Sequence, residues 1–185
     1  LLQTLVEILP RQVGSLFSLN SLREDLQVTH KTIAHWVEVL EKFYLHFRIY
    51  PFASTRIKSL RKQPKLYLWD WSQVEEHSLK LENMVASHLL KFVHLLHDVA
   101  GYKAELQFLH DIDGREVDFL VTVDKKPWLA VEVKSSAQTI STALRYFGDK
   151  LKIPFQYQLV ETSGVDMIRD GVRIMSVDKF LSGLA

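Results

Sequence analysis

The sequence predicts a two-domain protein of the α/β (α+β) class. Its 185 residues are enough for one large domain or two small ones. The first part has apolar residues at helical spacing and then two strand-like segments, whereas the later part has a long helix followed by several strands. This change of character falls between Trp71 and Ser78. We therefore expect one domain in residues 1–72 and a second in residues 73–185, built on a mixed sheet with flanking helices.

The composition is that of a folded globular protein. Hydrophobic residues make up 47% and charged residues 24% of the chain, and the net charge of +1 is too small for the whole surface to attract nucleic acid. Without cysteine, neither a disulfide nor a thiolate zinc site can form, which fits a reducing cytoplasm. No apolar run approaches the roughly 20 residues that span a bilayer. We expect a cytoplasmic protein with no membrane partner, and a fragment of a longer chain because it starts at Leu1 without Met.

The first domain is expected to be a winged helix. Its predicted helices span residues 1–9, 21–26 and 30–43. Ser21 is expected to cap the second helix, with Glu24 at the capping-box spacing, and Thr29 the third. Two helices joined by a tight turn make a helix-turn-helix. The alternating segments 44–50 and 65–69 then predict the hairpin that forms the wing.

Two groups of side chains in this domain are candidate contacts for a DNA backbone. The loop of the wing holds the cations Arg56, Lys58, Arg61 and Lys62. Lys31 and His35 lie on the side of helix 30–43 that we expect to be exposed. Glu38 and Glu41 on the same helix would repel phosphate. Packing against a protein partner is therefore the alternative to DNA binding for this helix.

The second domain is expected to open with a helix and continue as a mixed sheet. The predicted strands span residues 104–109, 116–123, 128–133, 155–160 and 172–177. The predicted helices span residues 74–96, 139–151 and 179–184, the last capped by Asp178. Three consecutive strands predict an antiparallel meander, and the helix after them carries the chain across to the next strand.

Three charged residues on neighbouring strands form the candidate catalytic site. Asp118 and Glu132 are equally far from Lys125, so a hairpin centred there sets them level, and strand alternation puts Lys134 on the face of Glu132. Charges inside apolar strands are costly unless they are paired or bind a metal. Two carboxylates can hold Mg²⁺, and a lysine beside them can stabilise a phosphate. This pattern predicts a metal-dependent phosphodiesterase in which Asp118 and Glu132 bind the ion.

The spacing of these residues resembles a known nuclease motif. Asp118 followed by Glu132-Val-Lys134 resembles the PD-(D/E)xK motif of restriction-endonuclease-like nucleases, with Val117 where that motif has proline. The resemblance implies a restriction-endonuclease-like fold for residues 73–185. It also implies that Glu82, on the first helix of that domain, is a further member of the catalytic site.

Nearly the whole chain resembles the C-terminal region of a group of prokaryotic AAA-type ATPases. The resemblance is carried, in order, by segments 64–70, 81–85, 116–119 and 132–134, after the predicted winged helix. In that group an N-terminal P-loop ATPase domain precedes a winged helix and a domain of unknown function related to PD-(D/E)xK nucleases. None of the seven glycines starts a P-loop motif, so the resemblance implies ATP binding in an N-terminal partner domain of the parent chain.

These patterns leave three hypotheses open. The leading one is an accessory region of an AAA-type ATPase that acts on DNA and cleaves a phosphodiester with Mg²⁺. The second is a catalytically inactive nuclease-fold module for protein interaction or assembly of the ATPase. The third is a DNA-binding regulator that uses only the winged helix.

Overall fold

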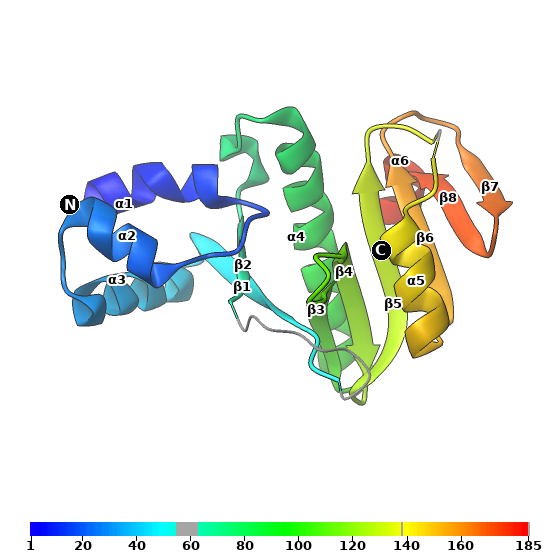
Figure 1. The fold of residues 1–185 in the computed structure, drawn as a ribbon, viewed down its shortest axis with the longest axis horizontal. Coiled ribbons are helices and arrows are strands. Elements are labelled where there is room, and N and C mark those ends of the chain that lie inside the picture. The colour runs from blue at the N-terminus through cyan, green and yellow to red at the C-terminus, as the bar shows by residue number, and fades with distance from the viewer. Residues whose placement is uncertain (55–62, 138, 185) are drawn as a thin grey trace. The chain divides into compact units, whose positions relative to one another are not determined.

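The protein is of the predicted mixed α/β (α+β) class (Figure 1). The computed structural model describes residues 1–54, 63–137 and 139–184. The chain divides into two compact units. The first unit comprises Leu1–Ile49 and Gln63–Ser87, and the second comprises Tyr50–Lys62 and His88–Ala185. None of the helices in the described ranges is long and apolar enough to cross a membrane.

The first unit begins with short helices. They are α1 (Leu2–Ile8), the 3-10 helix η1 (Leu9–Gln12), α2 (Leu19–Leu26) and α3 (His30–Lys42). The predicted cap Ser21 is wrong, because α2 starts earlier and the side chain of Ser18, on extended backbone, accepts a hydrogen bond from the Ser21 N–H at 3.3 Å. The predicted cap Thr29 is confirmed, since its hydroxyl accepts from the Thr32 N–H at 3.1 Å.

A hairpin follows these helices in the first unit. Its strands are β1 (His46–Pro51) and β2 (Lys65–Leu68), which pair antiparallel with Phe47 opposite Tyr67. The rings of Phe47 and Tyr67 stack with their centroids 5.8 Å apart. The first strand starts two residues later than predicted, because Tyr44 has a left-handed backbone with φ of 58°. The order of helices and hairpin is therefore the predicted one.

We expect a buried histidine to make the stability of the first unit depend on pH. The ring of His46 is buried, and its Nε2 lies 3.1 Å from the carbonyl oxygen of Val37. Burial lowers the pKa of His46 below 6.5, against an opposing effect of Glu41. We expect the free energy of unfolding to fall as the pH drops from about 7 to about 5, because only the unfolded chain then takes up this proton. Urea denaturation across this range should show a smaller pH dependence for His46→Gln, and an unchanged dependence would contradict the assignment.

Helix α4 (His77–Asp98) follows the short 3-10 helix η2 (Trp71–Gln73). It starts three residues later than the predicted position 74, because the Glu76 carboxylate accepts hydrogen bonds from the N–H groups of Ser78 and Leu79 at 3.1 and 2.8 Å. Within the first unit, the buried amide of Asn83 bridges both backbone groups of Leu68, accepting from its N–H at 2.9 Å and donating to its carbonyl at 2.7 Å.

The second unit is built on a mixed sheet. Its strands are β3 (Ala104–His110), β4 (Glu116–Val123), β5 (Lys126–Lys134), β6 (Phe155–Val160), β7 (Asp166–Arg169) and β8 (Val172–Ser176). Their order in the sheet is β3-β4-β5-β6-β8-β7. The predicted meander is confirmed by the antiparallel β3, β4 and β5, and the predicted crossover by the parallel pairing of β5 with β6. The sequence did not predict β7, because all four of its residues are exposed and show no apolar alternation.

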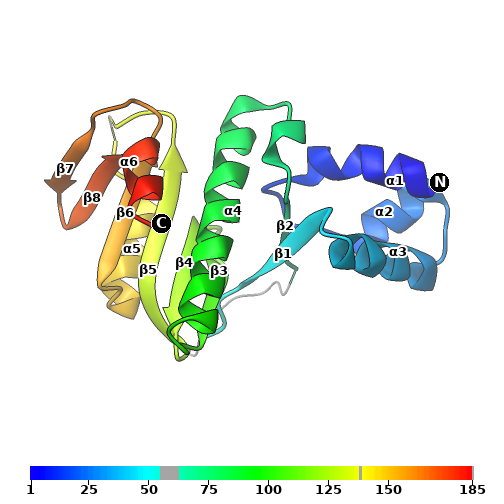
Figure 2. The same ribbon diagram turned by 180° about the vertical axis from the view of Figure 1, so that it is seen from behind.

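Helices pack on both faces of this sheet. Figures 1 and 2, which view the protein from opposite sides, show α5 (Thr142–Leu151) on one face and α6 (Val177–Ser182) on the other. Under α5, Leu144 and Phe147 are fully buried in a cluster with Leu120 and Ala130 of the sheet. The predicted cap Asp178 is wrong, because it lies within the first turn of α6 rather than before it.

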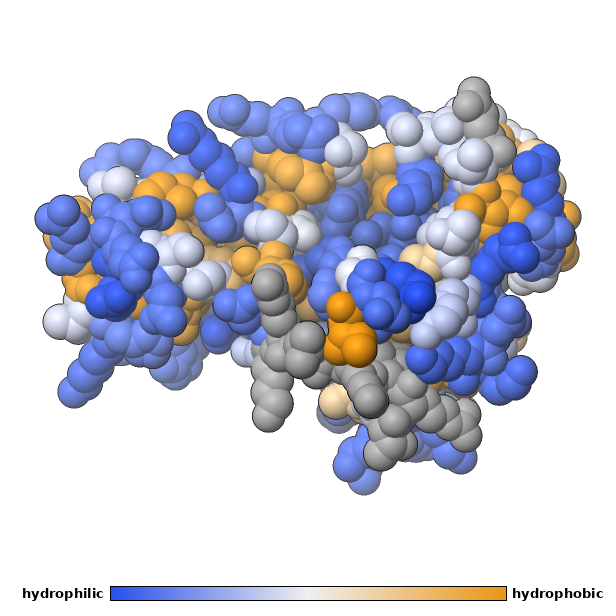
Figure 3. All heavy atoms as spheres, in the orientation of Figure 1, coloured by the Kyte–Doolittle hydropathy of each residue, from blue (hydrophilic) through white to orange (hydrophobic). Residues whose placement is uncertain are grey.

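The surface in the orientation of Figure 1 is mostly hydrophilic, with apolar residues visible between the polar ones (Figure 3). Such a mixture is usual, because much of a folded protein's accessible surface is apolar. The face of the second unit's sheet opposite α5 holds a cavity.

Candidate carboxylate and lysine site

The hairpin of β4 and β5 determines which residues meet in the site. Asp124 and Lys125 form its turn with left-handed φ angles of 48° and 64°, and Val123 pairs with Lys126 across it. Two consecutive left-handed residues are typical of the type I′ turn, whose twist suits a hairpin. The turn is therefore a two-residue turn rather than one centred on a single residue.

A β-bulge follows this turn. Thr122 pairs with Pro127, but Val121 pairs with Leu129, so Trp128 is an extra residue in β5. An extra residue moves every later residue of the strand by one position relative to its partner strand. The bulge therefore decides the face of each β5 residue beyond it.

The two candidate carboxylates are level because of that bulge. Past it, Phe119 pairs with Val131, which sets Asp118 beside Glu132. An uninterrupted ladder from the same turn would have set Asp118 opposite Val131 and Glu132 on the other face of the sheet. The prediction that Asp118 and Glu132 lie level with each other is thus confirmed. Their alignment depends on a bulge that the sequence did not predict.

A second irregularity lies at Asp118 itself. Between the pairs Gln107↔Leu120 and Leu109↔Val117, β4 has one more residue than β3. The extra residue falls within the Asp118-Phe119 segment. Bulges of this kind re-aim side chains and are frequent beside active sites.

Each carboxylate contacts the backbone of the other strand. The Val133 N–H donates to Asp118 Oδ2 at 2.8 Å, and the Asp118 N–H donates to Glu132 Oε2 at 3.4 Å. Lys134 Nζ lies 2.7 Å from Glu132 Oε1. The side chain of Glu132 is 6% exposed and that of Lys134 is 48% exposed. The buried carboxylate therefore lies beneath an amine that reaches solvent, with a second carboxylate beside it.

Two polar residues that were not predicted as site residues, Ser141 and Gln158, support the side chain of Glu132. The Ser141 hydroxyl, which caps α5, lies 3.4 Å from Glu132 Oε1. Gln158 is fully buried on β6 and level with Glu132. Its amide accepts from the Ser141 N–H at 2.8 Å and donates to the Thr139 carbonyl at 2.9 Å. The sequence signal that could have revealed this support is a glutamine within a segment predicted to be a strand, because a polar side chain buried there needs hydrogen-bond partners.

The other predicted site residues lie elsewhere in the chain. Glu82 belongs to the first unit, where its carboxylate accepts from the Tyr67 hydroxyl at 2.7 Å and lies 3.8 Å from Lys65 Nζ. Its membership of the catalytic site stays a prediction. Lys31 and His35 are exposed on α3, as expected. The wing cations Arg56, Lys58, Arg61 and Lys62 lie outside the described residues.

The carboxylate pair fits a magnesium ion by its chemistry. Within the described parts of the chain, no group of three or more histidine, aspartate or glutamate side chains could hold a metal. Mg²⁺ does not require such a group, because it is commonly held by one or two carboxylates together with water and substrate phosphate. Asp118 and Glu132 supply two carboxylates on adjacent strands.

By its fold and its candidate site, the protein belongs to the class of α+β proteins in which a mixed sheet carries two neighbouring carboxylates and a lysine. Residues 79–180, more than half of the chain, match the family described as domain of unknown function DUF4143, and the chain belongs to that family. Residues 1–82 match the family described as domain of unknown function DUF8612. No curated protein and no solved structure matches the chain.

Proposed function

We propose that the second unit is a Mg²⁺-dependent phosphodiesterase module that acts on DNA. One observation carries the proposal: a nearly buried Glu132 lies beside Asp118 and bonds to a Lys134 that reaches solvent. A buried carboxylate is costly, and its position next to a second carboxylate raises that cost unless cations neutralise the pair. A bound metal ion would offset both the cost of burying Glu132 and the repulsion between the two carboxylates.

Each residue of the site has a distinct role in this proposal. Asp118 and Glu132 would hold Mg²⁺, which supplies positive charge against the phosphate and acidifies a bound water. Lys134 donates hydrogen bonds to a phosphate oxygen and stabilises the charge that develops on it. Ser141 and Gln158 hold Glu132 in place, so that it does not reorganise during the reaction.

The proposed setting is an accessory region of an AAA-type ATPase. Support comes from the match to DUF4143, a domain found in AAA-ATPase-associated proteins, and from the order of helices and hairpin in the first unit. That unit would act as a winged helix and contact the DNA backbone through Lys31, His35 and the cations of residues 56–62. Such contacts weaken with added salt, as phosphate contacts do.

Cleavage of plasmid and single-stranded DNA by the 185-residue chain tests the proposal. We expect cleavage with Mg²⁺ or Mn²⁺ and none with a chelator. Asp118→Asn should abolish it, because the variant keeps an oxygen for the Val133 N–H but loses the charge that binds the ion. Asp149→Asn, at an exposed position of α5, is the matched control and should cleave normally. Absence of metal-dependent cleavage in the unmodified chain would contradict the proposal.

A non-catalytic assembly module is the second candidate function. It is favoured by the contacts of the site, since Lys134 already neutralises Glu132 and the Val133 N–H already satisfies Asp118. Buried ion pairs of this kind persist in proteins without any chemistry. Under this alternative, Mg²⁺ would neither support cleavage nor change stability.

A further inference from the structure

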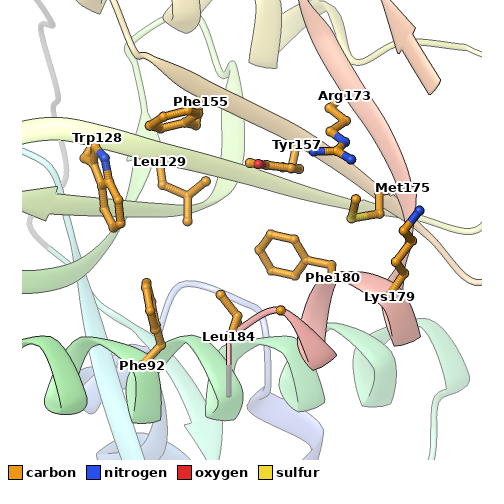
Figure 4. Close-up of a pocket in the computed structure, with 11 residues that line it drawn as sticks. Phe92, Trp128, Leu129, Phe155, Tyr157, Arg173, Met175, Lys179, Phe180 and Leu184 are labelled. Atoms are coloured by element: carbon orange, nitrogen blue, oxygen red, sulfur yellow. The ribbon is translucent and has the colours of Figure 1, made fainter. Parts of the chain in front are cut away.

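A cavity of about 300 Å³ opens on the face of the second unit's sheet that is opposite α5 (Figure 4). Leu129 of β5 and Tyr157 of β6 line it. Strand alternation puts their neighbours Ala130 and Gln158 on the α5 face, where Ala130 packs in the core under that helix. The cavity is therefore separate from Glu132 and Lys134, and nothing in the proposed nuclease mechanism uses it. Its volume is at the lower end of the range for small-molecule sites, about 300–1,000 Å³.

Aromatic rings form one end of the cavity. Phe92 of α4 stacks on Trp128 with centroids 6.1 Å apart, and Phe155 meets Trp128 edge-on with centroids 6.1 Å apart. Figure 4 shows these rings together at the end remote from the charged residues. Phe155 remains 48% exposed. Rings held by one another but still open to water offer a preformed apolar surface to a ligand.

The opposite end carries excess positive charge. Arg173 Nε and Nη2 donate to the two carboxylate oxygens of Asp166 at 2.8 and 2.9 Å, and Lys179 Nζ bonds to the same carboxylate. Two cations thus share one anion. Among the described residues that line the cavity, none is acidic. Asp166 also holds Arg173 in a fixed orientation, so little side-chain entropy is lost when an anion binds beside it.

We propose that this cavity binds a small amphiphilic anion. The apolar body, an aromatic ring system, would lie among Phe92, Trp128 and Phe155, and the single negative group would lie at Arg173 and Lys179. The charge at one end and the rings at the other set the orientation of the ligand. Because the cavity lies on the other face of the sheet, this binding does not depend on the proposed nuclease activity.

Two fluorescent probes of the same shape test this site. Anilinonaphthalene sulfonate carries the anion, and phenylnaphthylamine is its neutral counterpart. We expect saturable binding of the anionic probe to the folded chain at one site. Phe155→Ala should weaken both probes by roughly tenfold, because it removes part of the apolar wall. Lys179→Gln should weaken only the anionic probe, by roughly three- to fivefold.

Matched controls separate this site from general surface binding. Tyr102→Ala removes an aromatic ring that is 50% exposed outside the cavity, and Lys103→Gln removes an exposed lysine elsewhere. Both should bind each probe as the unmodified chain does. Leu184→Trp, just after α6, fills the cavity and should block the binding of both probes. This variant keeps the test decisive if Phe155→Ala lowers the stability of the protein. Equal losses in Tyr102→Ala and Phe155→Ala, or equal effects of Lys179→Gln on both probes, would overturn the proposal.

Discussion

Replacement of Glu132 by glutamine should lower Mg²⁺-dependent cleavage by about 100-fold. The variant retains the size of the side chain, and its remaining oxygen can keep the contacts with the Ser141 hydroxyl and Lys134 Nζ, whereas an amide NH2 replaces the oxygen that accepts from the Asp118 N–H. What it loses is the negative charge that would hold the metal ion. Initial rates of plasmid cleavage measure the effect, and the exposed strand residue Glu105 provides the control variant Glu105→Gln. Unchanged cleavage in Glu132→Gln would remove this residue from the mechanism.

Thermal stability distinguishes a metal site from a structural ion pair. If Asp118 and Glu132 hold a cation, they repel each other when it is absent, and Asp118→Asn should raise or preserve the melting temperature of the metal-free protein. Mg²⁺ should stabilise the unmodified chain and leave this variant unaffected, because a ligand stabilises only the state that binds it. If instead Asp118→Asn is destabilising and Mg²⁺ has no effect, the assembly module becomes the better description.

Replacement of Asn83 by alanine should destabilise the first unit by about 3 kcal/mol. The amide of Asn83 is the hydrogen-bond partner of both the N–H and the carbonyl of Leu68. Asn83 and Leu68 are both buried, so the freed N–H of Leu68 would lack water as a substitute, and its carbonyl would keep the longer 3.4 Å hydrogen bond from the Ser87 hydroxyl. The effect is large because one side chain satisfies two main-chain groups.

Tryptophan fluorescence can report this unit alone. Trp36, Trp69 and Trp71 lie in the first unit and Trp128 in the second, so urea denaturation is measured in a Trp128→Phe background. Asn20, the other asparagine of the chain, is exposed on α2. Asn20→Ala should change the free energy of unfolding by less than about 0.5 kcal/mol. A similarly small change for Asn83→Ala would contradict the role of its amide.

Local patterns in the sequence were sufficient for most helices and strands. The strands β4 and β6 have the predicted bounds, and Thr29 caps α3 as expected. These features depend on alternation and capping, which act over a few neighbouring residues. Features without such a local signal were missed, among them the exposed strand β7 and the cap at Ser18.

The candidate site shows which features local sequence patterns can predict and which they cannot. The sequence alone predicted that Asp118, Glu132 and Lys134 lie on neighbouring strands. The signal is the presence of charged residues within apolar alternating segments, where burial of a charge is costly. It did not predict the extra residue at Trp128, without which Glu132 would lie on the opposite face. Bulges arise from the packing of whole strands and have no dependable signature in neighbouring residues.

The sequence by itself therefore determined the fold class, the order of elements and the identity of the three charged residues, because these follow from periodicity along the chain. Only the tertiary structure decided the register that makes Asp118 level with Glu132, and the support of Glu132 by Ser141 and Gln158. It also decided the cavity on the other face of the sheet. The physical reason is the same for all three, since each depends on groups far apart in the chain whose positions are set by how strands and helices pack together.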